Sequence, residues 1–173
     1  HRVSRRQRQM CIRDSSYTGL EPINDQLGAT TRRFEFGGGD DDVTFSAGSV
    51  GNDGISRVSS VASSETVDFV NPTGSLTIDL GAGSDSLLVS SSDSQFAAGV
   101  TFLGGTGADT INASSLQVAA TIDGGDDNDI ITGGVNNDLI NGGGGNDVLD
   151  GANGDDQVIG DAGVDRIFGN LGN

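Results

Sequence analysis

Residues 124–173 read GGDDNDIIT, GGVNNDLIN, GGGGNDVLD, GANGDDQVI, GDAGVDRIF and GNLGN. A nine-residue unit is repeated five times, and a sixth copy begins. Every complete unit opens with Gly, has Asp at its sixth position and has an aliphatic residue at its eighth. The Asp residues are Asp129, Asp138, Asp147, Asp156 and Asp165. A fixed short period of this kind predicts a solenoid, in which neighbouring repeats stack and bury one continuous core.

The same unit recurs in the N-terminal half at wider spacing. Alternating apolar residues flank a turn rich in Gly and Asp at residues 33–45, 76–88 and 100–111, which predicts strand, turn, strand. The turns align on Asp41, Asp85 and Asp109, and an apolar residue lies seven before and two after each Asp of the chain's eight copies. The Asp-to-Asp steps are 44, 24 and 20 residues before they settle at nine. We therefore expect wider coils here, with additional strands at residues 99–102 and 117–120.

The apolar spacing nowhere settles at the three to four residues of a helix. The chain is therefore expected to be an all-β solenoid, with irregular coils over residues 32–123. A regular array follows over residues 124–173, and we interpret it as cut short at its C-terminal end. Residues 16–31 show no period and are expected to be a linker. Residues 46–75, rich in Ser and Gly, are expected to form a large loop or an eroded coil, with a turn at residues 71–74.

The first fifteen residues differ in composition from the rest. Residues 5–14, RRQRQMCIRD, resemble the translation of a transposase-derived sequencing adaptor. We expect residues 1–15 to be such an artefact and to be disordered. A basic nucleic-acid-binding or targeting arm is the alternative that the charge pattern leaves open. The segment contains His1, Met10 and Cys11, which are the only His, Met and Cys of the chain.

Outside that segment the chain carries 24 acidic residues against four Arg and no Lys, a net charge of −20. This charge would repel nucleic acid and anionic membrane surfaces, and no apolar run is long enough for a membrane span. These residues include no thiol and no imidazole, which excludes disulfides, His-dependent catalysis and the usual zinc sites. Motifs for a nucleophile elbow, a zinc protease and a phosphate loop are missing too, so no enzymatic activity is expected.

The turns of the repeat are suited to binding a cation through oxygen atoms alone. Gly at the second and fourth positions permits positive φ and close backbone approach, and Asp127 and Asn136 tolerate positive φ where the later Gly is missing. One inward aliphatic residue in nine is a small core for that much ordered backbone, and the stacked carboxylates repel one another. The metal-free chain is therefore expected to be barely folded or disordered. Calcium accepts six to eight carboxylate and carbonyl oxygens in loose geometry, whereas magnesium demands a strict octahedron, so several calcium ions are the expected ligands.

The nonapeptide resembles the repeats-in-toxin (RTX), or haemolysin-type, calcium-binding family, whose pattern is GGxGxDx, an aliphatic residue, then any residue. Residues 124–173 match this pattern closely, residues 104–112 fully, and residues 81–87 and 37–43 in part. The resemblance implies a right-handed parallel β-roll in which each calcium lies between turns of adjacent coils. It pairs carboxylates 18 residues apart: Asp129 with Asp147, Asp138 with Asp156, and Asp147 with Asp165. Asp109 is a further implied ligand, and Asp85 and Asp41 are additional candidates.

The resemblance also implies that turn carbonyls complete the calcium sites. These belong to Gly125, Gly134, Gly143, Gly145, Gly154 and Gly163. Three residues, Ala152, Asp161 and Asn170, depart from Gly at the second position of their units.

By resemblance, the chain is expected to be a calcium-dependent folding module of a larger secreted bacterial protein, outside the cell or on its surface. Its expected partners are calcium and the rest of a longer polypeptide. Two alternatives stay open. One is the C-terminal targeting and folding domain of a secreted hydrolase or toxin whose chemistry lies elsewhere. The other is an adhesin or surface repeat region, whose partner would be a cell surface or a glycan.

Overall fold

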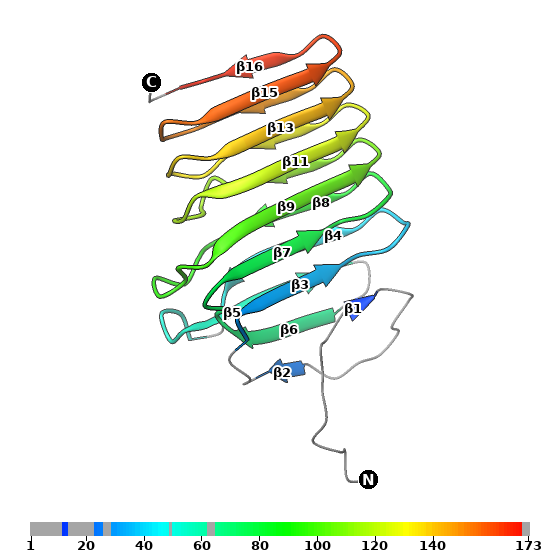
Figure 1. Cartoon of the computed structure of the whole chain (residues 1–173). Helices are drawn as coiled ribbons and strands as arrows, with labels where there is room; N and C mark the ends of the chain where they lie inside the picture. The colour runs from blue at the N-terminus through cyan, green and yellow to red at the C-terminus, as the bar shows by residue number, and fades with distance from the viewer. Residues whose placement is uncertain (1–11, 14–22, 26–28, 49, 62–64, 171–173) are drawn as a thin grey trace.

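The computed structural model describes residues 12–13, 23–25, 29–48, 50–61 and 65–170, and these form strands and turns without any helix. The chain winds into a β-solenoid of about five turns, stacked from the N-terminal coils at the bottom of Figure 1 to the C-terminal coils at the top. Within the described ranges, no helix is long and apolar enough to cross a membrane. The expected all-β solenoid is therefore confirmed.

Two sheets face each other across the core, and each coil contributes a strand to both. Sheet A is parallel throughout and consists, in order, of β1 (Ile12–Arg13), β3 (Thr31–Glu35), β7 (Ser75–Asp79), β9 (Gly99–Thr106), β11 (Ala120–Asp126), β13 (Leu139–Gly144) and β15 (Gln157–Ala162). Sheet B consists of β16 (Arg166–Phe168), β14 (Val148–Asp150), β12 (Ile130–Thr132), β10 (Thr110–Asn112), β8 (Ser86–Val89), β4 (Asp42–Ala47), β5 (Ile55–Ser60), β6 (Glu65–Val70) and β2 (Ile23–Asp25). Sheet B is parallel except at β4–β5 and β5–β6.

The register of both sheets follows the apolar positions that flank each Asp. In sheet A the residues seven before the Asp form one file: Phe34, Ile78, Phe102, Ile122, Ile140 and Val158. In sheet B the residues two after the Asp form another: Val43, Leu87, Ile111, Ile131, Leu149 and Ile167. Side chains alternate along a strand, so both files point into the core. All members are buried except Val158, which is partly buried, and Ile167, which is 49% exposed in the last described coil.

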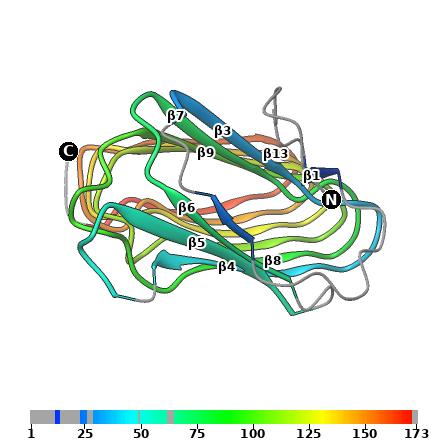
Figure 2. The same cartoon turned by 90° about the horizontal axis from the view of Figure 1, so that it is seen from below.

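The Ser- and Gly-rich stretch 46–75 is neither a large loop nor an eroded coil, which corrects the expectation. It contains β5 and β6, two antiparallel strands whose alternate residues are buried, among them Val58 and Phe69. Seen from below in Figure 2, these strands lie across the lower end of the coil stack. The Phe69 and Phe34 rings are 5.1 Å apart, and Arg32 Nε donates to the Val70 carbonyl at 3.2 Å. Strands β5 and β6 therefore connect the two sheets and cover the N-terminal end of the core.

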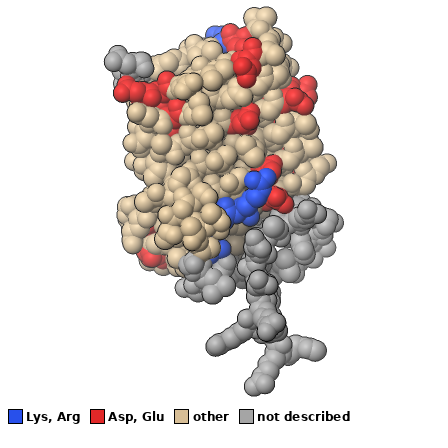
Figure 3. All heavy atoms as spheres, viewed as in Figure 1, with Lys and Arg blue, Asp and Glu red and all other residues tan. Residues whose placement is uncertain are grey.

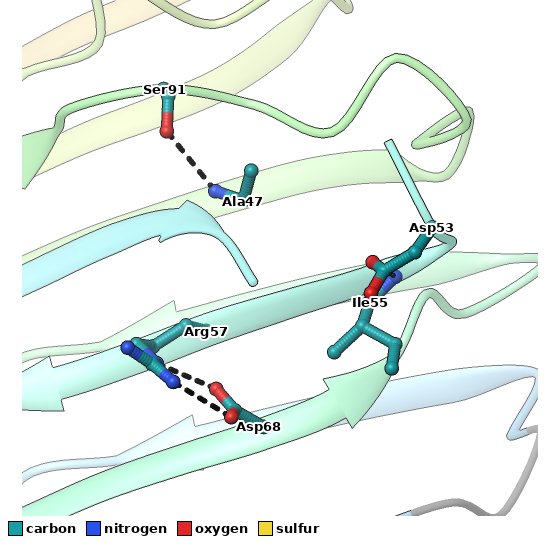
Figure 4. A network of polar contacts seen from close by, with 6 residues as sticks. All are labelled: Ala47, Asp53, Ile55, Arg57, Asp68 and Ser91. Atoms are coloured by element: carbon teal, nitrogen blue, oxygen red, sulfur yellow. Dashed lines mark hydrogen bonds and ion pairs between the residues drawn. The ribbon is translucent and has the colours of Figure 1, made fainter. Parts of the chain in front are cut away.

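Polar contacts also hold β5 and β6 in place. Arg57 on β5 donates from Nε and Nη2 to the two carboxylate oxygens of Asp68 on β6, at 2.6 and 2.8 Å (Figure 4). Ala47 N, at the end of β4, donates to Ser91 Oγ at 3.2 Å. A bidentate Arg–carboxylate pair fixes orientation as well as distance. This pair therefore also fixes the antiparallel register of β5 and β6 on the side of the strands that faces away from the core.

Three smaller expectations also need correction. Residues 99–102 begin β9 as expected, but of residues 117–120 only Ala120 belongs to a strand, because residues 113–119 form an irregular loop. The expected linker contains β2 and the start of β3. Within residues 1–15, expected to be disordered, Ile12–Arg13 pair with β3 as β1. The rest of that segment lies outside the described residues, and the artefact interpretation stays a prediction.

Candidate calcium sites between the coils

The turns that join the two sheets stack along two edges of the solenoid. The first edge, at the right of Figure 1, leads from sheet A to sheet B and consists of residues 36–41, 80–85, 104–109, 124–129, 142–147 and 160–165; in the last four of these turns, the first three residues are also the end of β9, β11, β13 or β15. The second edge leads back to sheet A and consists of residues 90–98, 113–119, 133–138 and 151–156. Successive nine-residue units therefore alternate between the edges. Two units make one coil, which is why equivalent turns lie 18 residues apart.

Six Asp residues form one continuous column along the first edge. The backbone N–H of each donates to Oδ1 of the Asp in the next coil, from Asp41 to Asp85, Asp109, Asp129, Asp147 and Asp165, at 2.7, 2.8, 2.8, 2.9 and 3.0 Å in turn. The steps of 44, 24, 20, 18 and 18 residues thus all correspond to a single coil. The structure brings together the predicted pairs Asp129–Asp147 and Asp147–Asp165, and it also places Asp41 and Asp85 in the column.

The second edge carries a single Asp pair. Asp138 N donates to Asp156 Oδ1 at 2.8 Å, which brings the third predicted pair together. In the preceding coil the position of Asp138 is taken by Ala120, whose N–H donates to Asp138 Oδ1 at 2.7 Å. Val100 is in register with Ala120 one coil earlier. Apolar side chains therefore occupy this register position in the wider coils, and the buried carboxylate of Asp93 on the same edge belongs to the loop 90–98 and not to an Asp pair.

Five of the six column carboxylates, all except Asp165, are buried, and four of these five have an oxygen without a hydrogen bond. Asp85, Asp109, Asp129 and Asp147 are at most 2% exposed. Their Oδ2 atoms, together with Oδ2 of Asp156, are buried and accept no hydrogen bond. A buried carboxylate oxygen without a partner is costly in its ionised form, because it has lost water and gained nothing. Each of these oxygens is therefore available to a cation.

The pKa values reflect the same environment. Burial, with repulsion from Asp109, Asp147 and Asp127, raises the pKa of Asp129 from 3.8 to about 7. Burial, with repulsion from neighbouring Asp residues, raises the pKa of Asp85 from 3.8 to about 6. Burial likewise raises the pKa of Asp109 and of Asp138. A bound cation would reverse this shift by stabilising the charged form.

Glycines keep the space between first-edge turns free of side chains. Gly125 and Gly143 have φ of 108° and 99°, and a Cβ on Gly143 would collide with the Gly125 carbonyl oxygen of the preceding turn. A Cβ on Gly145 or Gly163 would collide in the same way with the carbonyl of Asp127 or Gly145. A Cβ on Gly142, the first residue of its unit, would collide with Oδ2 of Asp147. Backbone carbonyls and a carboxylate therefore converge where ordinary side chains would stand.

One turn departs from the expected backbone geometry. Asp127 has a φ of 77° and confirms its predicted conformation, and Ala152, Asp161 and Asn170 also have positive φ at the second position. Asn136 does not, so that prediction is wrong. The reason is that turn 133–138 rests on the irregular loop 113–119 and not on a turn of its own kind. Val135 N donates to the Leu116 carbonyl at 3.3 Å, and Asn136 Nδ2 to the Gln117 carbonyl at 2.8 Å.

This turn also changes the surroundings of Asp138 and of the predicted ligand Gly134. Gly134 N donates to Asp138 Oδ2 at 2.6 Å, so both oxygens of Asp138 accept hydrogen bonds. The Gly134 carbonyl accepts from Asn153 N at 3.3 Å. Gly154, the other predicted ligand on this edge, has a φ of 131° and faces the Asn136 carbonyl. The second-edge pair is therefore better satisfied without a cation than the column is.

A ladder of amide side chains beside the column was not predicted. The fifth residue of the unit bonds to the fifth residue one coil later: Asn146 N donates to Asn128 Oδ1 at 2.6 Å, and Val164 N to Asn146 Oδ1 at 2.8 Å. On the second edge, Asp155 N donates to Asn137 Oδ1 at 3.0 Å. Asn at the fifth position of the first three units was the available signal. Because Asn is neutral, this ladder joins the coils without adding charge.

The carboxylate and carbonyl oxygens of the stacked turns are suited to bind a large cation that prefers oxygen ligands. No group of three or more Asp, Glu, His or Cys among the described residues converges to hold a metal. Each stacked turn pair instead offers carboxylates and backbone carbonyls, as calcium accepts. The face of the molecule in Figure 3 shows acidic side chains in separate patches, and arginine lies beside more than one of them. Five of the six column carboxylates are buried.

The turns agree with a known family of repeats. Residues 101–115, 120–149 and 141–173 match the model of the RTX calcium-binding nonapeptide repeat (4 copies). Comparison with curated proteins gave no match, and comparison with solved structures gave none. Asp109 and the five Asp residues of the regular array lie within the matched residues, whereas Asp41 and Asp85 lie outside them. Residues 101–173 therefore carry RTX calcium-binding nonapeptide repeats, a family whose repeats bind calcium.

Proposed function

We propose that the chain is a calcium-dependent folding module of a larger secreted bacterial protein. The observation that carries this proposal is the row of buried Oδ2 atoms without partners between stacked turns. Ionised and without a cation, these groups oppose the stacking of the coils. With calcium between the turns, the same groups attract the coils to one another.

The buried side chains are larger in the N-terminal coils than in the C-terminal coils. This difference supports the proposal that the C-terminal coils depend on calcium. The N-terminal coils bury the aromatic rings of Phe34, Phe45, Phe69, Phe96 and Phe102. After Phe102 the buried core residues are aliphatic or Ala, and the last of them is Leu149. At the first position of the regular units, carboxylate oxygens lie against glycines where apolar side chains would otherwise pack. Apolar burial is the main force that holds coils together, so cohesion here depends on satisfying the carboxylates.

The residues that would hold the ions are the column carboxylates, the Asp138–Asp156 pair and the turn carbonyls. Calcium bound there would neutralise the carboxylates and join adjacent coils. The chain's own contribution is the stacked register, which the glycines and the amide ladder maintain. We propose no catalytic role for any of these residues.

Calcium concentration would then act as the switch between an extended and a folded chain. Extracellular calcium modules bind at about 10⁻⁴–10⁻³ M, above the free calcium of a cytoplasm. A ligand that binds only the folded state stabilises it in proportion to the logarithm of its concentration. The chain would therefore remain unfolded during export and fold outside the cell.

Far-UV circular dichroism tests this proposal. In chelator we expect a spectrum dominated by disordered backbone, and titration with calcium to millimolar concentration should restore the strand signal. Magnesium at the same concentration should restore little, because it demands octahedral geometry. A full strand signal in chelator at neutral pH would disprove calcium-dependent folding.

A further inference from the structure

The chain contains two Asn–Gly peptides, Asn141–Gly142 in strand β13 and Asn153–Gly154 in a turn of the second edge. We propose that Asn141 is a deamidation site that folding protects, and that its modification in the unfolded chain prevents the C-terminal coils from forming. The reaction needs no partner except water. This inference rests on the proposed function, since calcium decides how long the chain stays unfolded, but it concerns a covalent change of the chain itself.

An Asn side chain followed by Gly reacts readily with its own backbone. Gly has no Cβ, so the nitrogen of the following peptide is unobstructed and the backbone adapts easily. The lone pair of the Gly142 nitrogen bonds to Cγ of Asn141, the Cγ–Nδ2 bond breaks, and the proton of the peptide nitrogen leaves with Nδ2 as ammonia. Water then opens the five-membered imide. Opening at Cγ leaves aspartate at position 141, and opening at the backbone carbonyl leaves isoaspartate, in which the main chain runs through the former side chain.

In the folded chain the backbone of Asn141 is held in a geometry that prevents this attack. Strand β13 lies between β11 and β15 in sheet A (Figure 1), and Asn141 is in register with Asp123 and Ile159. Gly143 is paired on both sides as well. The Asn141 side chain therefore projects from the face of the sheet, whereas the Gly142 nitrogen lies in the plane of the strands. Bringing the two together requires a rotation that breaks the pairing of β13.

The packing around Gly142 leaves no room for the imide either. Gly142 is buried, and a Cβ there would collide with Oδ2 of Asp147 and lie 2.9 Å from the Gly160 carbonyl oxygen. The imide ring adds atoms at the Gly142 nitrogen, so it can form only after the coil has opened. The same contact with Asp147 requires Gly at position 142. The packing of the folded coil thus requires the residue that makes this peptide reactive in the unfolded chain.

Asn153–Gly154 provides an internal reference, because folding constrains its Asn side chain much less. Asn153 is exposed in the turn between β14 and β15, and its N–H donates to the Gly134 carbonyl at 3.3 Å. Its side chain makes no hydrogen bond with the described residues. Because both sites are Asn–Gly in one chain, the ratio of their rates cancels the effects of pH, buffer and temperature.

Modification of Asn141 would damage the coil in two ways. Isoaspartate adds one methylene to the main chain within β13, which shifts the residues beyond it out of register with both neighbouring strands. Aspartate places a second carboxylate opposite Asp123 on the adjacent strand, about 4.8 Å away, where like charges repel. The longer the chain stays without calcium, the smaller is the fraction that can still fold.

Peptide mapping of the whole chain after incubation at mildly alkaline pH tests the protection. A protease that cuts before Asp releases residues 138–146 and 150–154, each with one Asn–Gly. Fragmentation in the mass spectrometer locates the change from amide to acid, and chromatography separates aspartate from isoaspartate. In chelator we expect similar rates at the two sites. In millimolar calcium the rate at Asn141 should fall about tenfold or more relative to that at Asn153, because reaction there waits for local opening.

The ratio of the two rates decides whether the fold protects Asn141. The same ratio in calcium and in chelator, from a chain that circular dichroism shows to be folded only in calcium, would overturn the inference. A full strand signal in chelator would instead disprove the proposed function, and the chain in urea then becomes the unfolded reference. A slower reaction at Asn141 in the folded chain than in urea still supports the inference, and an equal rate overturns it.

A second measurement tests the consequence for folding. Wild type aged in chelator is transferred to calcium, and size exclusion separates the folded from the unfolded fraction. The unfolded fraction should be enriched in isoaspartate at position 141, and equal contents in the two fractions would overturn this role. Asn141→Ser should retain more of its own initial calcium-induced strand signal after ageing than the matched control Asn153→Ser, and equal losses would count against Asn141 as the critical site.

Discussion

Asp147 is the residue whose substitution most sharply tests the pairing of carboxylates across coils. Its Oδ1 accepts from Asp129 N at 2.9 Å, its own N–H donates to Asp165 Oδ1 at 3.0 Å, and its Oδ2 is buried without a partner. It therefore flanks two turn pairs, whereas Asp165 is in the last coil that the structure describes. In Asp147→Asn, an amide oxygen can still accept from Asp129 N, so the change removes charge and little else.

The expected effect is the loss of two ions. Removing one partner from a buried charge pair costs about 3–5 kcal/mol, which lowers affinity by about two to three and a half orders of magnitude. Extracellular calcium sites bind at about 10⁻⁴–10⁻³ M, so a site damaged in this way needs about 10 mM calcium or more. At 1 mM free calcium, Asp147→Asn should leave both flanking sites empty, and Asp165→Asn should leave one empty.

Equilibrium dialysis against radioactive calcium measures the number of bound ions directly. Protein should be quantified by amino-acid analysis, because the chain has no Trp and one Tyr. Asp126→Asn, an exposed residue of the same edge, controls for the change in net charge. Loss of the same number of ions in Asp147→Asn and Asp165→Asn would refute the pairing. It would mean that each ion is bound by the carboxylate of a single Asp, the one whose Oδ1 accepts a hydrogen bond from the preceding coil.

Three further predictions concern acidity, turn sterics and the amide ladder. The pKa of Asp129 is raised from 3.8 to about 7 in the metal-free fold, so its ionisation removes stability as pH rises from about 4 to about 7, by about 4 kcal/mol in total. The strand signal in chelator should therefore be stronger at pH 5 than at pH 8, and a signal independent of pH would contradict the burial of this carboxyl. Gly143→Ala should abolish calcium-induced folding, because its φ is 99° and its Cβ would collide with a carbonyl, whereas Gly144→Ala should fold normally, since a Cβ there meets nothing closer than 3.8 Å. Circular dichroism in calcium compares the two, and identical titrations would show that turn stacking is looser than described. Asn146→Ala removes the acceptor for Val164 N and should cost about 1 kcal/mol. Thermal unfolding in saturating calcium should show this as a lower midpoint with the same number of bound ions; a lost ion would instead place Asn146 at a cation site.

Much of this protein follows from its sequence, because the decisive properties are local. Strand alternation sends the apolar residues that flank each Asp inward, and they form the two core files found in the structure. Glycine sterics make the second and fourth turn positions recognisable, and the positive φ of Asp127 agrees with that pattern. The 18-residue pairing of Asp residues was implied by the resemblance to the RTX repeats and not by the nine-residue period alone, and the structure places these residues one coil apart because two units make one coil.

Only the tertiary structure sorts the eight Asp residues into a column of six and a separate pair. A repeat pattern sets the direction of each side chain, but not how many residues a loop takes up before the chain returns to the same edge. The 44-residue step is one coil because the chain forms the antiparallel strands β5 and β6 before it returns to the first edge. The contact of Phe69 with Phe34 and the hydrogen bonds from Arg57 to Asp68 hold these strands in place. Asn136 departs from its predicted conformation for a related reason, since its turn rests on an irregular loop. These outcomes depend on contacts between residues far apart in the chain. A local sequence period carries no information on such contacts.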